Sequence, residues 1–308
     1  MKRVYLYVLL IMGMMVSSCE EHMPDMPDLR MMLDAEVQEM AQHPSRAIED
    51  VDIRTGSLVT EMRATVWFSE TFGVYPSSSP EAPTFLPYRA NLTYDASSTI
   101  VYTEPDDKKN PISYDVEEES NIYCVGFYPQ NGWTTNQANT IASHEVNGMQ
   151  DLMFAKQQSG SLFNKMDKQV YEHLLVWLKF TICATGPDAV SDWGKIQSIT
   201  LKGGKGNLKI TLGSGEVSYT KLEDVIDVLD SPTDLSVSIQ DIGSALCIPE
   251  NSYSLEIKMD KGTRNIELSG DSGFEKGRLY LVTLYFNPYN EINAVCSLVP
   301  WNEENVEL

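Results

Sequence analysis

Residues 170–182 read VYEHLLVWLKFTI, in a chain of 308 residues. Within this stretch the apolar residues Val176, Leu178, Phe180 and Ile182 recur at every second position. Because successive side chains of a strand point to opposite faces, this period places the four on one face. The stretch therefore predicts a single long strand from Val170 to Ile182.

Shorter alternating runs lie on both sides of this stretch. Strands are expected at 62–68, 88–94, 98–103, 112–116, 121–128, 195–202, 207–212, 235–239, 252–259, 263–268, 278–286 and 292–301. Turns rich in Gly, Asn and Asp separate them, and the best helix candidate, Lys221–Leu229, is short. Many short strands without intervening helices predict an all-β fold of antiparallel β-sandwiches.

The composition divides the chain into parts. Residues 19–57 are polar, acidic and rich in proline, and are interpreted as a tether; its apolar residues Met31, Leu33, Ala35 and Val37 form a stripe that predicts one weak strand. The strand pattern starts after this tether, and a polar stretch at 156–169 interrupts it. The prediction is an N-terminal sandwich at 58–160 and a C-terminal sandwich at 165–308.

The N-terminus carries an export signal. Lys2 and Arg3 precede an apolar stretch, Val4–Val16, that is too short to be a typical transmembrane helix. Val16-Ser17-Ser18-Cys19 follows and resembles a bacterial lipobox, in which the cysteine becomes the acylated first residue. Residues 1–18 are therefore predicted to be a lipoprotein signal peptide and Cys19 the lipidation site; the alternative is an ordinary cleaved signal with a chance cysteine.

The charge argues against nucleic acid as a partner. The chain has 44 Asp and Glu against 23 Lys and Arg, a formal net charge of −21. Phosphate contacts and adsorption to anionic lipid both need clustered basic residues, and here these are few and scattered. The predicted link to a membrane is the lipid on Cys19.

Neither a metal site nor an enzyme emerges from the sequence. No Cys or His spacing matches a metal site, so no cofactor is expected. Cys124, Cys183, Cys247 and Cys296 lie in strand-like runs, and disulfides and buried thiols stay equally open. The segment 270–273 (GDSG) resembles the surroundings of the nucleophilic serine of trypsin-like proteases, but no histidine has a matching context, and a tight turn is expected instead.

Arg46 and Arg54 lie in the proline-flanked segment 44–56. An accessible segment of this kind can enter a protease, and each arginine would be a trypsin-type cleavage site. The other interpretation is that both are plain solvated side chains.

Several segments together resemble the fimbrillin-like proteins of Bacteroidales, the lipoprotein-derived subunits of protease-assembled (type V) fimbriae. They are the lipobox followed by Glu20-Glu21, YCVGFYP at 123–129, DLMFA at 151–155, HLLVWLKF at 173–180, GRLYLVTL at 277–284 and VPW at 299–301. Each segment is weak alone, and their order and spacing carry the resemblance.

This resemblance implies two transthyretin-like β-sandwich domains, export as an outer-membrane surface lipoprotein, and assembly with other fimbrial subunits by donor-strand exchange. It also implies a trypsin-like cut near the first strand; Arg46 is the first candidate and Arg54 the second, because a cut there releases the Met31–Val37 stripe. Stalk subunits of the family carry extra C-terminal strands to donate, whereas this chain stops seven residues after Trp301, so a tip or an anchor position is as open as a stalk position.

The alternative function is a surface lipoprotein that binds a glycan or a host protein. Exposed aromatic side chains such as Trp133 or Trp193 would then serve as stacking platforms. The structural interpretation of both tryptophans is packing in the core or at its rim.

Overall fold

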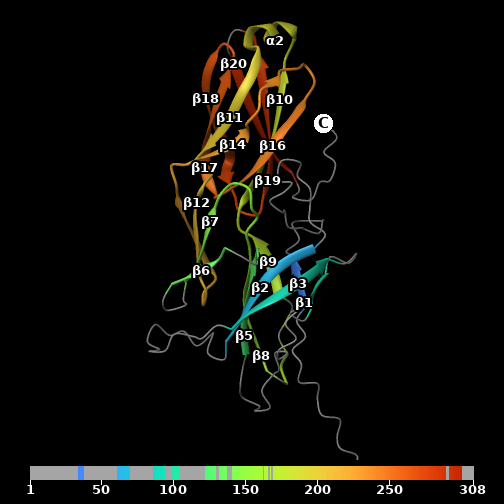
Figure 1. Ribbon diagram of the computed structural model, residues 1–308, viewed down its shortest axis with the longest axis vertical. Helices are drawn as coiled ribbons and strands as arrows, with labels where there is room; N and C mark the ends of the chain where they lie inside the picture. Colours follow the sequence, from blue (N-terminus) through green and yellow to red (C-terminus); the bar gives the residue numbers. More distant parts are fainter. Residues whose placement is uncertain are drawn as a thin grey trace, which may run out of the picture.

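The computed structural model describes residues 34–37, 61–69, 86–94, 99–103, 122–129, 132–136, 141–161, 163–165, 167, 169–288 and 291–299. Within these residues nearly all secondary structure is β, in four sheets that Figure 1 shows along the length of the molecule. The described part contains one short helix, α2 (Pro187–Trp193), and no helix there is long and apolar enough to span a membrane. The predicted all-β fold class is confirmed.

The first sheet contains seven strands and closes on itself. The strands follow one another in the order β1, β4, β3, β2, β5, β8 and β9, and β9 pairs again with β1. Their bounds are β1 (Asp34–Val37), β2 (Glu61–Ser69), β3 (Leu86–Tyr94), β4 (Thr99–Thr103), β5 (Ile122–Tyr128), β8 (Met153–Gly160) and β9 (Gln169–His173). Because it is closed, this sheet has no free edge, and we call it the closed sheet.

Two further sheets form a sandwich, drawn in the upper part of Figure 1. One has the order β16, β10, β19, β20; the other has the order β14, β11, β17, β18, with β15 also paired to β11. Their bounds are β10 (Val176–Ala184), β11 (Lys195–Lys202), β14 (Val225–Leu229), β15 (Thr233–Asp234), β16 (Gln240–Cys247), β17 (Glu250–Met259), β18 (Gly262–Phe274), β19 (Leu279–Asn287) and β20 (Glu291–Val299).

The core of the sandwich confirms the alternation seen in the sequence. Val176, Leu178, Phe180 and Ile182 are fully buried and belong to one cluster with side chains of the facing sheet, such as Leu255. Burial of a large aliphatic or aromatic side chain contributes about 1.5–3 kcal/mol. The period-two pattern of β10 therefore anchors the sandwich.

A small fourth sheet lies between the closed sheet and the sandwich. Its order is β13, β12, β7, β6, with β6 (Thr134–Thr135), β7 (Ile141–Val146), β12 (Gly206–Thr211) and β13 (Glu216–Lys221). Strand β7 precedes the predicted domain boundary and β12 follows it, yet the two are paired with His144 opposite Leu208. Strand pairing therefore crosses the division at 160–165, and the two-domain division itself stays a prediction.

The predicted strand from Val170 to Ile182 is wrong in one respect, because the structure divides it into β9 and β10. The break falls at Leu174 and Leu175, two consecutive leucines that are both fully buried. Strand β9 pairs with β8 and β1 of the closed sheet, whereas β10 pairs with β16 and β19 of the sandwich, so the chain passes from one sheet to the other at these two leucines. The Tyr219 hydroxyl donates a hydrogen bond to the Leu174 carbonyl at 2.6 Å, and burial raises the pKa of Tyr219, which keeps it a donor.

Helix and pairing direction also differ from the sequence interpretation. The helix candidate Lys221–Leu229 is wrong: β14 occupies its second half, where Val225, Ile226 and Val228 favour a strand. The short helix α2 instead starts with Pro187, a residue suited to a first helical position. Most pairings are antiparallel as expected, but β1–β9 and β10–β19 are parallel.

Three of the cysteines are free thiols in the structure. Cys183 and Cys247 are buried in the sandwich, and Cys296 is partly buried on β20. Burial raises the pKa values of Cys247 and Cys296, so both stay protonated. At these three positions the structure agrees with the second interpretation, in which buried thiols pack as small hydrophobic side chains.

A glycine inside the closed sheet allows strand β9 to pack closely. A Cβ atom on Gly126 of β5 would overlap the hydroxyl and ring of Tyr171 from β9, and Tyr171 is fully buried. We expect Gly126→Ala to lower the free energy of unfolding by about 1–3 kcal/mol because a packed side chain must move. Denaturant unfolding followed by fluorescence measures this change.

Gly186 provides the matched control for this substitution. A Cβ atom there would meet nothing within 4 Å, and its backbone is extended. Gly186→Ala should change the free energy of unfolding by less than about 1 kcal/mol. An equal loss in both variants would contradict the close packing of Tyr171 on Gly126.

Candidate functional site

The candidate site is the position that strand β1 occupies in the closed sheet. Strand β1 lies between β4 and β9, antiparallel to β4 and parallel to β9. It is four residues long, and neither β4 nor β9 directly follows it in the sequence. We call the space between β4 and β9 that this strand fills the β1 slot.

The register explains the apolar stripe of the tether. Ala35 is the register partner of Gln169, and Val37 is the partner of Tyr171. Paired positions on neighbouring strands share one face of a sheet, and Gln169 and Tyr171 are both fully buried. The apolar positions of the stripe thus coincide with the buried face of β9.

Strand β9 forms one wall of the slot and has two different faces. Gln169, Tyr171 and His173 are buried, whereas Val170 and Glu172 between them are partly exposed. On the outer face the Glu172 carboxylate lies 3.0 Å from the Lys156 ammonium and 3.6 Å from that of Lys276. The inner face of the closed sheet therefore carries a polar side chain at each end of β9, Gln169 at the start and His173 at the end.

A buried contact between His173 and Asp151 joins the end of β9 to the segment just before β8. The Nδ1 atom of His173 lies 2.8 Å from Oδ2 of Asp151, and both side chains are essentially inaccessible to water. The Leu174 amide also donates a hydrogen bond to the Leu152 carbonyl at 2.8 Å. These contacts hold the chain at the point where it leaves the closed sheet.

The three site residues predicted from the sequence, Cys19, Arg46 and Arg54, lie outside the described residues, so their roles stay predictions. Their order in the chain still relates two of them to the slot, because Arg46 and Arg54 lie between β1 (34–37) and β2 (61–69). A cut after either arginine would separate β1 from every other described strand. The sequence predicted this consequence for the stripe but not the neighbours of β1.

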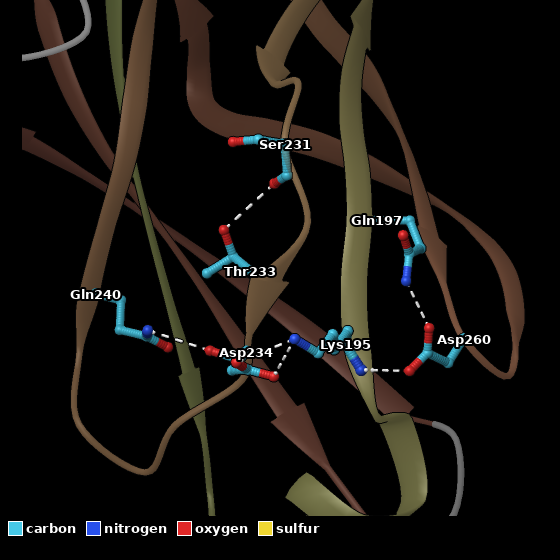
Figure 2. Close-up of polar contacts among 7 residues, drawn as sticks. All are labelled: Lys195, Gln197, Ser231, Thr233, Asp234, Gln240 and Asp260. Atoms are coloured by element: carbon cyan, nitrogen blue, oxygen red, sulfur yellow. Dashed lines mark hydrogen bonds and ion pairs between the residues drawn. The ribbon is translucent and has the colours of Figure 1, made fainter.

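A second group of polar residues gathers beside α2 at the far end of the sandwich (Figure 2). The Lys195 ammonium lies 3.0 Å from the Asp234 carboxylate, and the Lys195 amide donates to Asp260 at 3.0 Å. Gln197 donates to the same Asp260 carboxylate, and Gln240 donates to the Asp234 carbonyl. The hydrogen bond from the Lys195 amide, followed by that from Gln197, lowers the pKa of Asp260. This group links the ends of β11, β15 and β16 to the turn after β17 and is interpreted as structural support.

The two tryptophans proposed as stacking platforms have different surroundings. Trp193 is 1% exposed, and its Nε1 atom donates to the Asn287 carbonyl at 2.7 Å, so its interpretation as an exposed platform is wrong. Trp133 is partly buried against Phe127 and His144, with ring centroids 4.9 and 5.0 Å away. Trp133 therefore lies at the rim of the core.

The GDSG segment also differs from the expected tight turn. Its residues belong to the end of β18, which pairs with β17 across a register shift near Ser252. Ser272 is exposed there, whereas His173 is buried with Asp151 at the closed sheet. Among the residues with described side chains, no group of three or more His, Cys, Asp or Glu could hold a metal ion.

A family profile described as fimbrillin-like matches residues 60–301, which is most of the chain. The chain belongs to the fimbrillin-like family. The resemblance drawn from the short segments is thereby confirmed, and the match begins just before β2, so it covers every described strand except β1. Membership of this family supports an adhesive surface or fimbrial protein.

Solved structures support the fold of this fimbrillin-like chain. The first is a "putative cell adhesion protein" from Bacteroides uniformis ATCC 8492, with 14% identity, a TM-score of 0.55, and coverage of 88% of this chain and 98% of that chain. The second has the same description, comes from Bacteroides ovatus ATCC 8483, and shows 12% identity, a TM-score of 0.55, and coverage of 90% and 99%. Among curated proteins, none matches the chain significantly.

The buried pair at the end of β9 leads to a test on the fimbrillin-like fold. Removing one member of a buried ion pair leaves the other without its partner and costs about 3–5 kcal/mol. We expect Asp151→Leu to lower the free energy of unfolding by an amount in this range. The double variant Asp151→Leu/His173→Leu should lose less than the sum of the two single variants, because neither buried polar side chain is then left without the other. Additive losses in a double-mutant cycle would show that the pair is not coupled.

Proposed function

We propose that this protein is a non-enzymatic adhesive fimbrial subunit, exported as an outer-membrane lipoprotein and assembled by donor-strand exchange at the β1 slot. The observation that carries the proposal is the place of β1. This short strand closes the sheet between β4 and β9, and the chain joins it to the remaining strands through the segment that contains Arg46 and Arg54.

The physics of an open sheet supports an exchange. If β1 leaves, the backbone donors and acceptors of β4 and β9 that face it lose their partners, and the inner face of the sheet is uncovered. A sheet edge of this kind pairs readily with an extended segment of another chain. A strand of another fimbrial subunit would restore both the hydrogen bonds and the cover of Gln169 and Tyr171.

The first test of this function is proteolysis of the folded protein. We expect an arginine-specific protease to cut after Arg46 or Arg54, because the strands of the sheets resist cleavage. The cut protein should then release the segment with β1 and bind partner subunits. Mass spectrometry identifies the cut, and size-exclusion chromatography measures the association.

The variant Arg46→Ala/Arg54→Ala is the control, since it keeps the strand connected. It should stay uncut in this segment and remain monomeric with the same partners. If the cut wild-type protein also stays monomeric with partner subunits present, donor-strand exchange at this slot is wrong. The remaining function is then a surface lipoprotein that binds a glycan or a host protein.

A separate test concerns the lipid anchor. In a lipobox the cysteine thiol is the acyl acceptor, so Cys19→Ala should abolish lipidation. We expect the variant to leave the detergent phase in phase partitioning and to be lost from the outer-membrane fraction. Retention of the variant in the detergent phase would show that Cys19 is not the anchor.

A further inference from the structure

The β1 slot contains one polar group that the resident strand leaves without a partner. Gln169 is the first residue of β9, and its side chain is fully buried. Neither its amide nitrogen nor its amide oxygen has a hydrogen-bond partner among the residues that the structure describes. Buried polar side chains are almost always paired, so an orphaned amide at this position requires an explanation.

The register shows why β1 does not satisfy this amide. The partner of Gln169 on β1 is Ala35, and a methyl side chain can neither donate nor accept a hydrogen bond. On the other side, the oxygen of the partly buried Gln157 in β8 also lacks a partner. The resident strand thus pairs with β9 through its backbone, but its residue opposite Gln169 offers no side-chain hydrogen bond.

This mismatch has a thermodynamic consequence for exchange. A buried amide without a partner raises the free energy of the state that holds β1. A strand with a hydrogen-bonding side chain opposite Gln169 removes that penalty, so it binds more tightly than β1 in the same slot. The orphaned amide therefore favours replacement of the resident strand.

We propose that Gln169 selects the donor strand. The donor that replaces β1 carries Ser, Thr or Asn at the position opposite Gln169 and an apolar residue at the position opposite Tyr171. Paired side chains in a sheet are about 5 Å apart at Cβ, a separation that suits a short polar side chain facing a glutamine. The proposal rests on the donor-strand exchange described above and names the partner as an extended segment of another fimbrial subunit.

The first part of the test uses the intact full-length chain and does not depend on exchange. Ala35→Ser should shift the unfolding equilibrium roughly fivefold toward the folded state, because the new hydroxyl can bond the amide. The same change should give no gain in the background of Gln169→Leu, a variant that fills the site with an apolar side chain of similar size. The control Gln157→Leu should leave the gain unchanged. Equal effects of Ala35→Ser with and without Gln169 would overturn the contact.

The second part measures selection on the full-length protein cut by the arginine-specific protease. Two labelled peptides that copy residues 29–42, one unchanged and one with Ala35→Ser, compete for the slot. We expect the Ala35→Ser peptide to bind roughly tenfold more tightly, and this preference should disappear in Gln169→Leu.

The outcomes separate this inference from the proposed function. If both peptides bind equally, exchange stands and selection by Gln169 is wrong. If neither peptide binds to a protein that has lost its β1 segment, exchange at this slot is wrong, and donor selection falls with it whatever the first part shows.

Discussion

The backbone of β9 must be paired on both of its edges, and the structure depends on this constraint. Strand β8 pairs with one edge and β1 with the other. At its end β9 continues through Leu174 and Leu175 into β10, which lies between two other strands of the sandwich. Loss of β1 therefore removes backbone pairing from β9, whereas the buried core around Leu174 and Leu175 keeps β10 in place.

The proposed exchange requires one strand to leave while the rest of the fold stays in place. The sandwich has an apolar core around Phe180, and a second cluster joins Phe127 of the closed sheet to Leu246 of the sandwich. By contrast, β1 has four residues and pairs through its backbone with β4 and β9. A subunit that exchanges one strand must keep the rest of its fold, and this distribution of buried contacts meets that need.

Much of the fold could be predicted from the sequence, because alternation is a local property. A period-two pattern predicted the buried face that contains Val176 and Phe180. The same kind of pattern predicted a weak strand at Met31–Val37, where the structure has β1 at 34–37. The partner of a strand can lie far away in the chain, so the sequence could not predict the pairing of β1 with β9, of β10 with β19, or of β7 with β12. Gln169 was missed for the same reason: a glutamine in a polar stretch signals nothing until its register partner is known.

Hydrogen exchange of the β9 amides measures whether β1 closes the sheet. In the intact protein the amides of residues 169–173 should be protected, since β1 pairs with residues 169–171 and β8 with residues 171–173. After proteolytic removal of β1 the amides of residues 169–171 should exchange faster than before, while residues 172–173, which pair with β8, and the amides of β10 keep their protection. An added donor peptide should restore the protection of residues 169–171. Unchanged protection of β9 after loss of β1 would contradict the account, because β1 would then not be the strand that closes the sheet.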